Sequence, residues 1–212
     1  MTTLIPAHVG AAADLATFAR RVARFEPDSA VRLVAAGMVA GCFAETPFDA
    51  LALRSTALAE PLEVDVVLEA ATLAARAVGT AGELELPPAL PALRWTASLP
   101  PRSGWSESSR LSVAEVMAQV GAGVDEFRNR AAGVVDGLTV RAGQAALEGL
   151  ATEVWNRELA AGMPLRLAHA AASYGFLGDG GEVVLRSAGA WWRLDAPHGS
   201  VLARSGFALF AL

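Results

Sequence analysis

Two stretches of the chain carry apolar residues at the three- and four-residue spacing of an amphipathic helix. The first covers residues 12–25 and ends before Pro27, a residue that disfavours helical geometry in its predecessor. The second covers residues 112–132 and opens with Ser112 and Glu115, whose spacing is that of a capping box. We therefore predict an amphipathic helix in each stretch, with one face against a core.

Further helices are predicted from other local signals. Asp65 precedes an apolar run that ends at Gly79, which predicts a capped helix between these two residues. A helical stripe covers residues 143–159, and Pro164 then opens a shorter helix that ends near Tyr174. The last two helices form a pair in the second half of the chain.

Alternating apolar residues predict strands in both halves. In the first half the segments are interrupted at Gly37 and at Thr46–Pro47, which predicts an antiparallel meander of three strands. A fourth strand is predicted after the proline-rich loop of residues 80–92. In the second half, a turn at residues 178–181 leads into a hairpin and one more strand. The predicted strands are residues 30–36, 38–45, 50–58, 93–99, 182–187, 190–195 and 200–204.

These elements predict an α+β fold: an antiparallel sheet with packed helices, followed by a C-terminal helix pair and β-hairpin. The loop at residues 133–143 is the predicted boundary between an α+β domain, residues 1–132, and a helix–helix–β-hairpin subdomain, residues 133–212. The two parts are also compatible with packing as one domain.

Nucleic-acid binding is a third-ranked hypothesis. The order of helices and hairpin in the second half resembles a winged helix. A recognition helix presents several polar and basic side chains to DNA, whereas the helix after Pro164 offers Arg166, His169 and Ser173. The net charge of −5 also argues against a large phosphate-binding surface. We therefore regard nucleic acid as an unfavoured partner.

The apolar composition predicts a protein that self-associates. Hydrophobic residues make up 53% of the 212 residues and charged residues 18%. The apolar tail, residues 207–212, is predicted to pack in the protein's own core or across a dimer interface. The longest earlier apolar run, residues 34–44, is too short for a membrane helix, and the first ten residues lack a signal-peptide pattern. A cytoplasmic homodimer is the expected form.

The chain is lysine-free, since all 17 basic residues are arginine. This composition excludes a Walker-type phosphate loop, a kinase-type ATP lysine and a Schiff-base lysine. Cys42 is the only cysteine, which excludes intramolecular disulfides, and its apolar neighbours predict a small core residue. No histidine or cysteine stands at metal-ligand spacing from another, so no metal or cofactor is predicted.

The densest chemistry of the chain lies near its C-terminal end. The candidate ligand- or partner-binding residues are Trp191, Trp192, Arg193, Asp195 and His198. Adjacent tryptophans on a strand point to opposite faces, so one can fill the core while the other meets solvent, a ligand or a partner. The alternative is that both are covered by protein.

Asp195, His198 and Ser200 are the residue types of a hydrolytic triad. True triads converge from separate elements, whereas these three residues lie within six positions. Proline second and glycine fourth in residues 196–199 also fit a type I turn. We therefore predict a structural turn and no catalytic residue, although His198 has the chemistry to act alone as a base or as a ligand-orienting group.

The sequence resembles uncharacterised proteins of actinobacteria. The resemblance is carried by residues 99–105, 164–178 and 189–201, and it implies no activity, cofactor or catalytic residue. The first hypothesis is therefore a non-catalytic interaction module that self-associates. The second is a small-ligand-binding protein or enzyme with a pocket near Trp191, Arg193 and His198, and the third is the winged-helix-like nucleic-acid binder.

Overall fold

The computed structural model describes residues 2–76, 79, 82–134 and 140–205 of the chain. The chain forms two compact units, Met1–Pro100 (unit 1) and Pro101–Leu212 (unit 2). Each unit combines helices with antiparallel strands, which confirms the predicted α+β class. The predicted boundary at residue 132 lies inside unit 2. The predicted packing of the tail, residues 207–212, lies outside the described residues.

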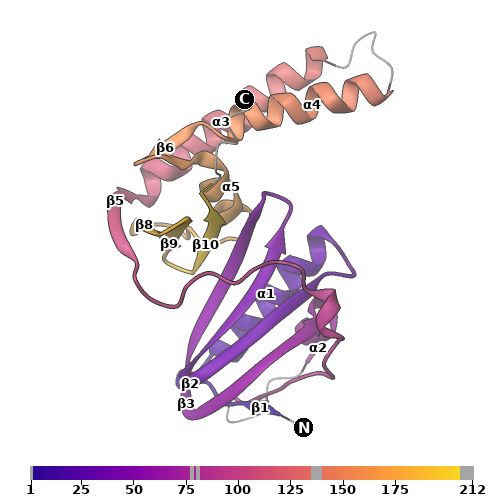
Figure 1. The fold of residues 1–212 in the computed structure, drawn as a ribbon, viewed down its shortest axis with the longest axis vertical. Coiled ribbons are helices and arrows are strands. Elements are labelled where there is room, and N and C mark those ends of the chain that lie inside the picture. Colours follow the sequence, from indigo (N-terminus) through magenta and orange to yellow (C-terminus); the bar gives the residue numbers. More distant parts are fainter. Residues whose placement is uncertain (1, 77–78, 80–81, 135–139, 206–212) are drawn as a thin grey trace. The chain divides into compact units, whose positions relative to one another are not determined.

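Unit 1 is built on a long antiparallel hairpin of β2, Ala30–Thr46, and β3, Ala50–Glu69 (Figure 1). The predicted strand end at Gly37 is wrong. Gly37 lies within β2 with a φ of 64° and marks a shift of the strand register. Glycine adopts this left-handed conformation without strain, so the strand forms a bulge here instead of turning back. The predicted meander of three strands is therefore a hairpin of two long ones.

The first part of the helix predicted between Asp65 and Gly79 is also strand. Asp65 does not cap a helix, because Arg32 of β2 donates two hydrogen bonds of 2.8 Å to its carboxylate. The valines of this segment favour extended geometry, and its pairing with β2 outweighs the local helical pattern. Only α2, Ala70–Ala75, is helical.

The predicted helix at residues 12–25 is confirmed as α1, Ala11–Phe25. Both α1 and α2 contact the β2–β3 hairpin, and the apolar stripe of α1 enters the core of unit 1. Leu15 and Phe18 of α1 and Leu33 and Leu68 of the hairpin are buried there. The sequence pattern thus predicts which face of α1 is covered.

Short elements complete unit 1. β1, Thr3–Leu4, pairs with β4, Leu84–Glu85. The strand predicted at residues 93–99 is wrong, because a 3₁₀ turn, η1, occupies Ala92–Arg94. The indole of Trp95 then donates a hydrogen bond of 2.6 Å to the carbonyl of Ala97, a local bond that folds this segment back on itself.

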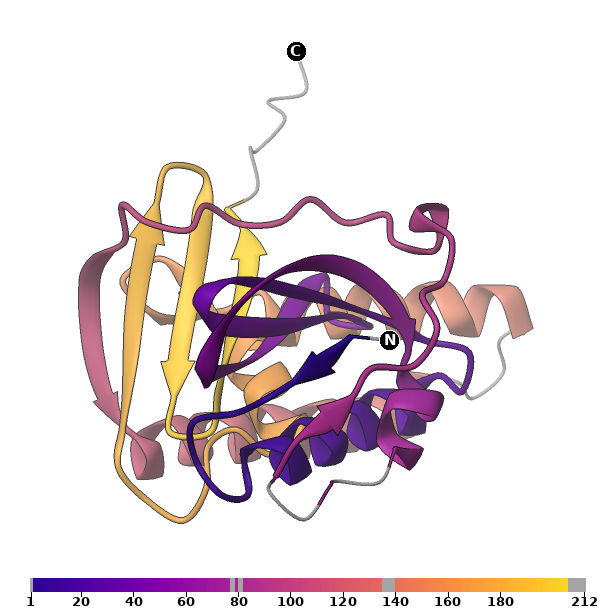
Figure 2. The same ribbon diagram turned by 90° about the horizontal axis from the view of Figure 1, so that it is seen from below.

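Unit 2 contains an antiparallel sheet with the strand order β10-β9-β8-β5. Figure 2 shows β8, β9 and β10 side by side. The predicted C-terminal strands are confirmed, and the hairpin of β8 and β9 belongs to this larger sheet. β5 was not predicted, since its sequence is mostly polar. The strands are β5, Ser106–Ser112; β8, Glu182–Ala188; β9, Trp191–Ala196; and β10, Gly199–Arg204.

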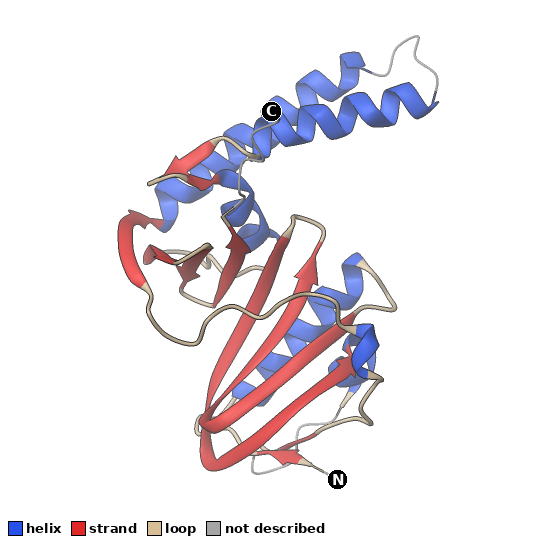
Figure 3. Cartoon of the chain, viewed as in Figure 1, coloured by secondary structure: helices blue, strands red, loops and turns tan. Residues whose placement is uncertain are grey.

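The helices of unit 2 agree with the predicted ones. The capping box is confirmed: the Glu115 amide donates to the Ser112 hydroxyl at 3.2 Å, and the Ser112 amide donates to the Glu115 carboxylate at 2.7 Å. α3 and α4 form an antiparallel hairpin (Figure 3), and α5 contacts β9 and β10. The elements are α3, Val113–Val134; α4, Val140–Trp155; β6, Glu158–Ala160; β7, Met163–Pro164; and α5, Leu165–Ser173.

Two further expectations from the sequence concern the position of Cys42 and the absence of a membrane-spanning helix. Cys42 is fully buried, which confirms a core position, and burial raises the pKa of its thiol to about 12. No helix among the described residues has the length and apolar character needed to cross a membrane.

Candidate functional site

The candidate site is the face of the unit 2 sheet that carries Arg193 and Asp195. Residues directly opposite one another in antiparallel strands point to the same face, and alternate residues of a strand share a face. Trp191, Arg193 and Asp195 of β9 therefore share one face, while Trp192 and the buried Leu194 share the other. The two tryptophans point to opposite faces as expected. Both are half-buried, so neither is a fully buried core residue.

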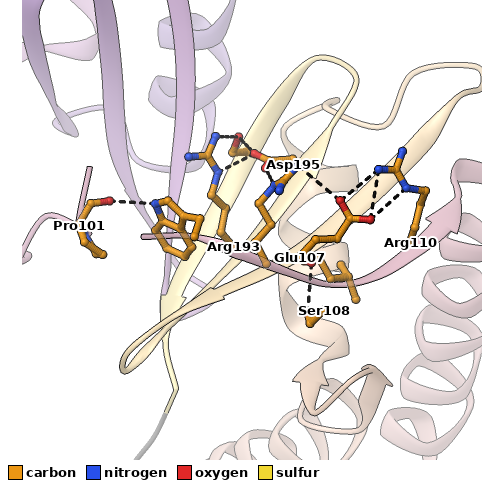
Figure 4. A network of polar contacts seen from close by, with 10 residues as sticks. Pro101, Glu107, Ser108, Arg110, Arg193 and Asp195 are labelled. Carbon is orange, nitrogen blue, oxygen red and sulfur yellow. Dashed lines mark hydrogen bonds and ion pairs between the residues drawn. The ribbon is translucent and has the colours of Figure 1, made fainter. Parts of the chain in front are cut away.

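Asp195 is the centre of a polar network on this face (Figure 4). Its carboxylate accepts hydrogen bonds from Arg193 Nε at 2.6 Å and from Arg186 Nε at 3.0 Å. The hydroxyl of Ser200 donates a third, also 2.6 Å long. Asp195, Arg186 and Arg193 are only 25–32% exposed, so the two guanidinium groups are held in a partly desolvated position.

The network continues across the sheet to β5. Arg186 forms an ion pair of 3.8 Å with Glu107, and Glu107 also accepts hydrogen bonds from Arg110. Arg110 donates a further bond of 2.6 Å to Glu182. Bonds to Glu182 and Glu107 raise the pKa of the Arg110 guanidinium, which keeps it charged. We call this row of alternating charge, from Arg110 through Glu107, Arg186 and Asp195 to Arg193, the charge ladder.

Two tryptophans border the charge ladder on the same face. The guanidinium carbon of Arg193 lies 5.7 Å from the centroid of the Trp105 ring, and that of Arg204 lies 5.4 Å from the Trp191 ring. Both distances are those of cation–π contacts. The Trp105 indole also donates a hydrogen bond of 3.0 Å to the carbonyl of Pro101. Together with the charge ladder, these residues form the tryptophan–arginine face.

His198 lies in the turn between β9 and β10 and is exposed. Its backbone amide donates to the carbonyl of Phe176 at 2.9 Å. Its imidazole packs against Gly178, where an added Cβ would come within 2.6 Å of Nε2. The structure thus gives the histidine ring a packing position beside the turn.

Asp195, His198 and Ser200 are not arranged in the geometry of a hydrolytic triad. In a triad the serine hydroxyl faces the histidine base, and the carboxylate orients that base. In this chain Ser200 donates directly to Asp195, and Arg193 and Arg186 donate to the same carboxylate. The arrangement holds charged groups in place and provides no activated nucleophile. The part of the chain that the structure describes also contains no cluster of three metal-ligating side chains.

Sequence reasoning identified the β9 residues but missed their partners. Arg186 could have been found, because it stands at an alternate position of a correctly predicted strand. Arg110 and Glu107 could not, since the segment that carries them has no apolar alternation. Trp105 was also missed, because its contact with Arg193 depends on the position of β9 in the sheet.

Comparison with protein families places the chain among domains without an assigned activity. A model described as "Domain of unknown function (DUF8185)" matches residues 100–208. The chain belongs to this family. A second model, "Domain of unknown function (DUF8010)", matches residues 1–97. The two matched segments meet where units 1 and 2 meet, and unit 2, which carries the tryptophan–arginine face, corresponds to DUF8185. No curated protein matches the chain.

Solved structures give a likeness of fold. The DNA polymerase III subunit beta from Pseudomonas aeruginosa matches with a TM-score of 0.51 and 12% identity, covering 99% of this chain and 66% of that one. The DNA polymerase sliding clamp from Caulobacter crescentus matches with a TM-score of 0.50 and 12% identity, covering 99% of this chain and 68% of that one. The chain spans about two thirds of the length of these clamps, and identity this low shows similarity of fold alone.

Proposed function

We propose that this protein is a non-catalytic interaction module that self-associates, and that the tryptophan–arginine face of unit 2 is its contact surface. The observation that carries the proposal is the position of Arg193, which is bonded to Asp195 and placed over Trp105. Tryptophan and arginine are enriched in the energetically dominant parts of protein interfaces. Residues already held by ion pairs lose little conformational freedom when a partner binds.

The charge ladder favours a second copy of the chain as the partner. Its charges alternate in sign across the strands, from Arg110 and Glu107 of β5 to Asp195 and Arg193 of β9. A two-fold axis brings the same surface patch of two subunits together, so every contact occurs twice. When the two-fold axis passes between two neighbouring charges of the row, each of them faces a charge of opposite sign in the other copy. The similarity of fold to polymerase clamps agrees with a role within an assembly.

The proposal is tested by the oligomeric state of the full chain. Sedimentation velocity over a wide range of protein concentration is expected to show a concentration-dependent dimer. Trp191→Ala and Arg193→Ala are each expected to weaken the dimer at least tenfold, because each removes a tryptophan or arginine side chain of the proposed contact surface. Arg128→Ala is the matched control, since Arg128 is a highly exposed arginine on α3 with only a 3.7 Å ion pair.

Circular dichroism establishes that the variants are folded before they are compared. A wild-type chain that is monomeric at every concentration contradicts self-association. A dimer that Trp191→Ala and Arg193→Ala leave intact contradicts the assignment of the contact surface to this face.

Binding to DNA is a second candidate, favoured by the fold likeness to proteins whose names connect them with DNA polymerase. Two observations oppose it: the net charge is −5, and the arginines of the charge ladder are already paired with carboxylates. Fluorescence anisotropy with labelled duplex DNA at low salt distinguishes the candidates. We expect no rise in anisotropy, whereas salt-dependent binding favours the DNA hypothesis.

A further inference from the structure

Unit 1 contains an apolar groove that the proposed contact surface does not use. One wall is formed by alternate residues of β3, namely Val64, Val66 and Leu68. Another part of the lining is the segment that follows β4, which includes Leu86 and a pair of prolines. The groove has a volume of about 380 Å³. Pockets that bind small molecules have volumes of roughly 300–1,000 Å³, so the groove has the size of a small-ligand site.

Among the described residues that line this groove, Arg76 alone has a charged side chain. Arg76 directly follows α2, and its backbone amide caps that helix by donating to the carbonyl of Leu73 at 3.2 Å. Its Nε is shielded from solvent and has no hydrogen-bond partner in the structure described. A buried guanidinium nitrogen without a partner costs free energy, because it has lost its water without gaining another acceptor.

We propose that this groove binds a small monocarboxylate with an apolar chain. The carboxylate accepts hydrogen bonds from Arg76, and the chain lies against β3 and the proline-containing segment. The chemistry of the lining selects this class of ligand. Arginine presents a planar set of donors that matches a carboxylate, whereas the remaining lining is almost wholly apolar and offers nothing for a polar tail.

Rigid walls support binding in a groove of this kind. Pro87 and Pro88 have fixed φ angles, and β3 is held in place along its length by β2. Preformed walls reduce the entropy that is lost when a ligand binds. The site lies wholly in unit 1, so this proposal does not depend on the contact surface proposed for unit 2.

The test uses the full chain and decanoate as the probe. Isothermal titration measures the affinity, and methyl NMR signals of Val64, Val66, Leu68 and Leu86 locate the bound chain. We expect decanoate to shift these signals at saturation. Arg76→Gln is expected to raise the dissociation constant roughly tenfold, because it removes the charge while keeping a side chain of similar length. Arg20→Gln, an exposed arginine on α1, is the matched control and is expected to change nothing.

Two further probes separate the charge from the apolar chain. Decanol carries the chain without the carboxylate, so its weaker binding is expected to be insensitive to Arg76→Gln. Acetate carries the charge alone and is expected to leave the methyl signals unchanged. Thermal unfolding of Arg76→Gln establishes that the variant is folded.

The proposal is overturned if decanoate does not bind, or if it binds the wild type and Arg76→Gln equally. It is also overturned if the methyl signals of these four residues shift with rising protein concentration in the absence of decanoate, because a second copy of the chain then fills the groove.

Discussion

The two units of this chain reach a buried core by different routes. Unit 1 relies on two long strands, β2 with 17 residues and β3 with 20, joined by a tight turn. Unit 2 relies on strands of six or seven residues, three of which are joined by short turns. A long hairpin keeps its register through many cross-strand pairs, whereas short strands depend on the geometry of their turns. Substitutions of turn residues should therefore lower the free energy of unfolding more in unit 2 than in unit 1. Substitutions of core residues should lower it equally in both units.

The largest effect is expected from core truncation, which tests whether the two cores are equivalent. Leu33 of β2 and Leu185 of β8 are both fully buried strand residues. Each substitution to alanine should lower the free energy of unfolding by about 3 kcal/mol, because it leaves a cavity in a packed core. Urea denaturation measures both variants. A much smaller loss of unfolding free energy in one unit would show that its core is loosely packed. That result would contradict the expectation that the two cores are equivalent.

The next effect concerns the turn between β9 and β10. An added Cβ at Gly199 would come within 2.6 Å of the ring of Phe176, whereas one at Gly180 meets nothing within 4 Å. Gly199→Ala should therefore cost about 2 kcal/mol by overpacking. Gly180→Ala should leave the midpoint of urea denaturation unchanged or slightly raised. Equal midpoints for the two variants would contradict the close fit of this turn.

A smaller effect is expected at the bulge of unit 1. Gly37 has a φ of 64° with open space around its Cα, so a substitution there tests backbone strain alone. Gly37→Ala should cost about 1 kcal/mol, and Gly37→Asn less, because asparagine tolerates the left-handed region better. Thermal unfolding ranks the variants. If Gly37→Ala lowers the free energy of unfolding more than Gly199→Ala does, local backbone geometry matters more in the long hairpin of unit 1 than in unit 2. That result would contradict the expected difference between the units.

The smallest effect concerns the ion pairs of Glu126, a residue of α3, with Arg130 of the same helix and with Arg157, which follows α4. Glu126 accepts hydrogen bonds from Arg157 and Arg130, and these bonds lower its pKa to about 2. Because the pKa is lower in the folded state, the stabilisation is present above the ordinary pKa of a glutamate and is lost as the pH falls toward 2. Glu126→Gln should therefore be less stable than the wild type at pH 7, and the difference should shrink between pH 4.5 and pH 2.

Asp125→Asn serves as the control for that measurement. Asp125 is highly exposed and lies 3.7 Å from Arg128, so its substitution should have little effect at any pH. A difference between Glu126→Gln and the wild type that persists unchanged to pH 2 would mean that the carboxylate charge is not what stabilises the helix pair.

Local signals predicted the elements whose structure is determined by residues close in sequence. The capping box of Ser112 and Glu115 starts α3, Pro164 precedes α5, and the apolar stripe of α1 is buried as its spacing predicts. The turn at residues 178–181 likewise leads into β8. These elements depend on bonds and contacts within one or two helical turns or across one tight turn, and such contacts are encoded in neighbouring residues.

Other elements were decided by residues far apart in the chain. Asp65 has the residue type of a helix cap, but Arg32, 33 positions away, binds its carboxylate and keeps it in β3. Gly37 has the residue type of a turn, but pairing along the whole of β3 makes it a bulge. The polar segment that forms β5 becomes a strand because β8 offers it backbone partners.

The same division applies to the candidate site. The sequence by itself determined the class of fold, the lack of lysine chemistry, and the gathering of Trp191, Arg193 and Asp195 on one strand face, since strand alternation is a local property. Only the tertiary structure decided that Arg186 and Glu107 complete the charge ladder, that Ser200 binds Asp195, and that Arg76 lines an apolar groove. Those contacts join separate strands and loops, and their free energy depends on distances that the order of residues does not specify.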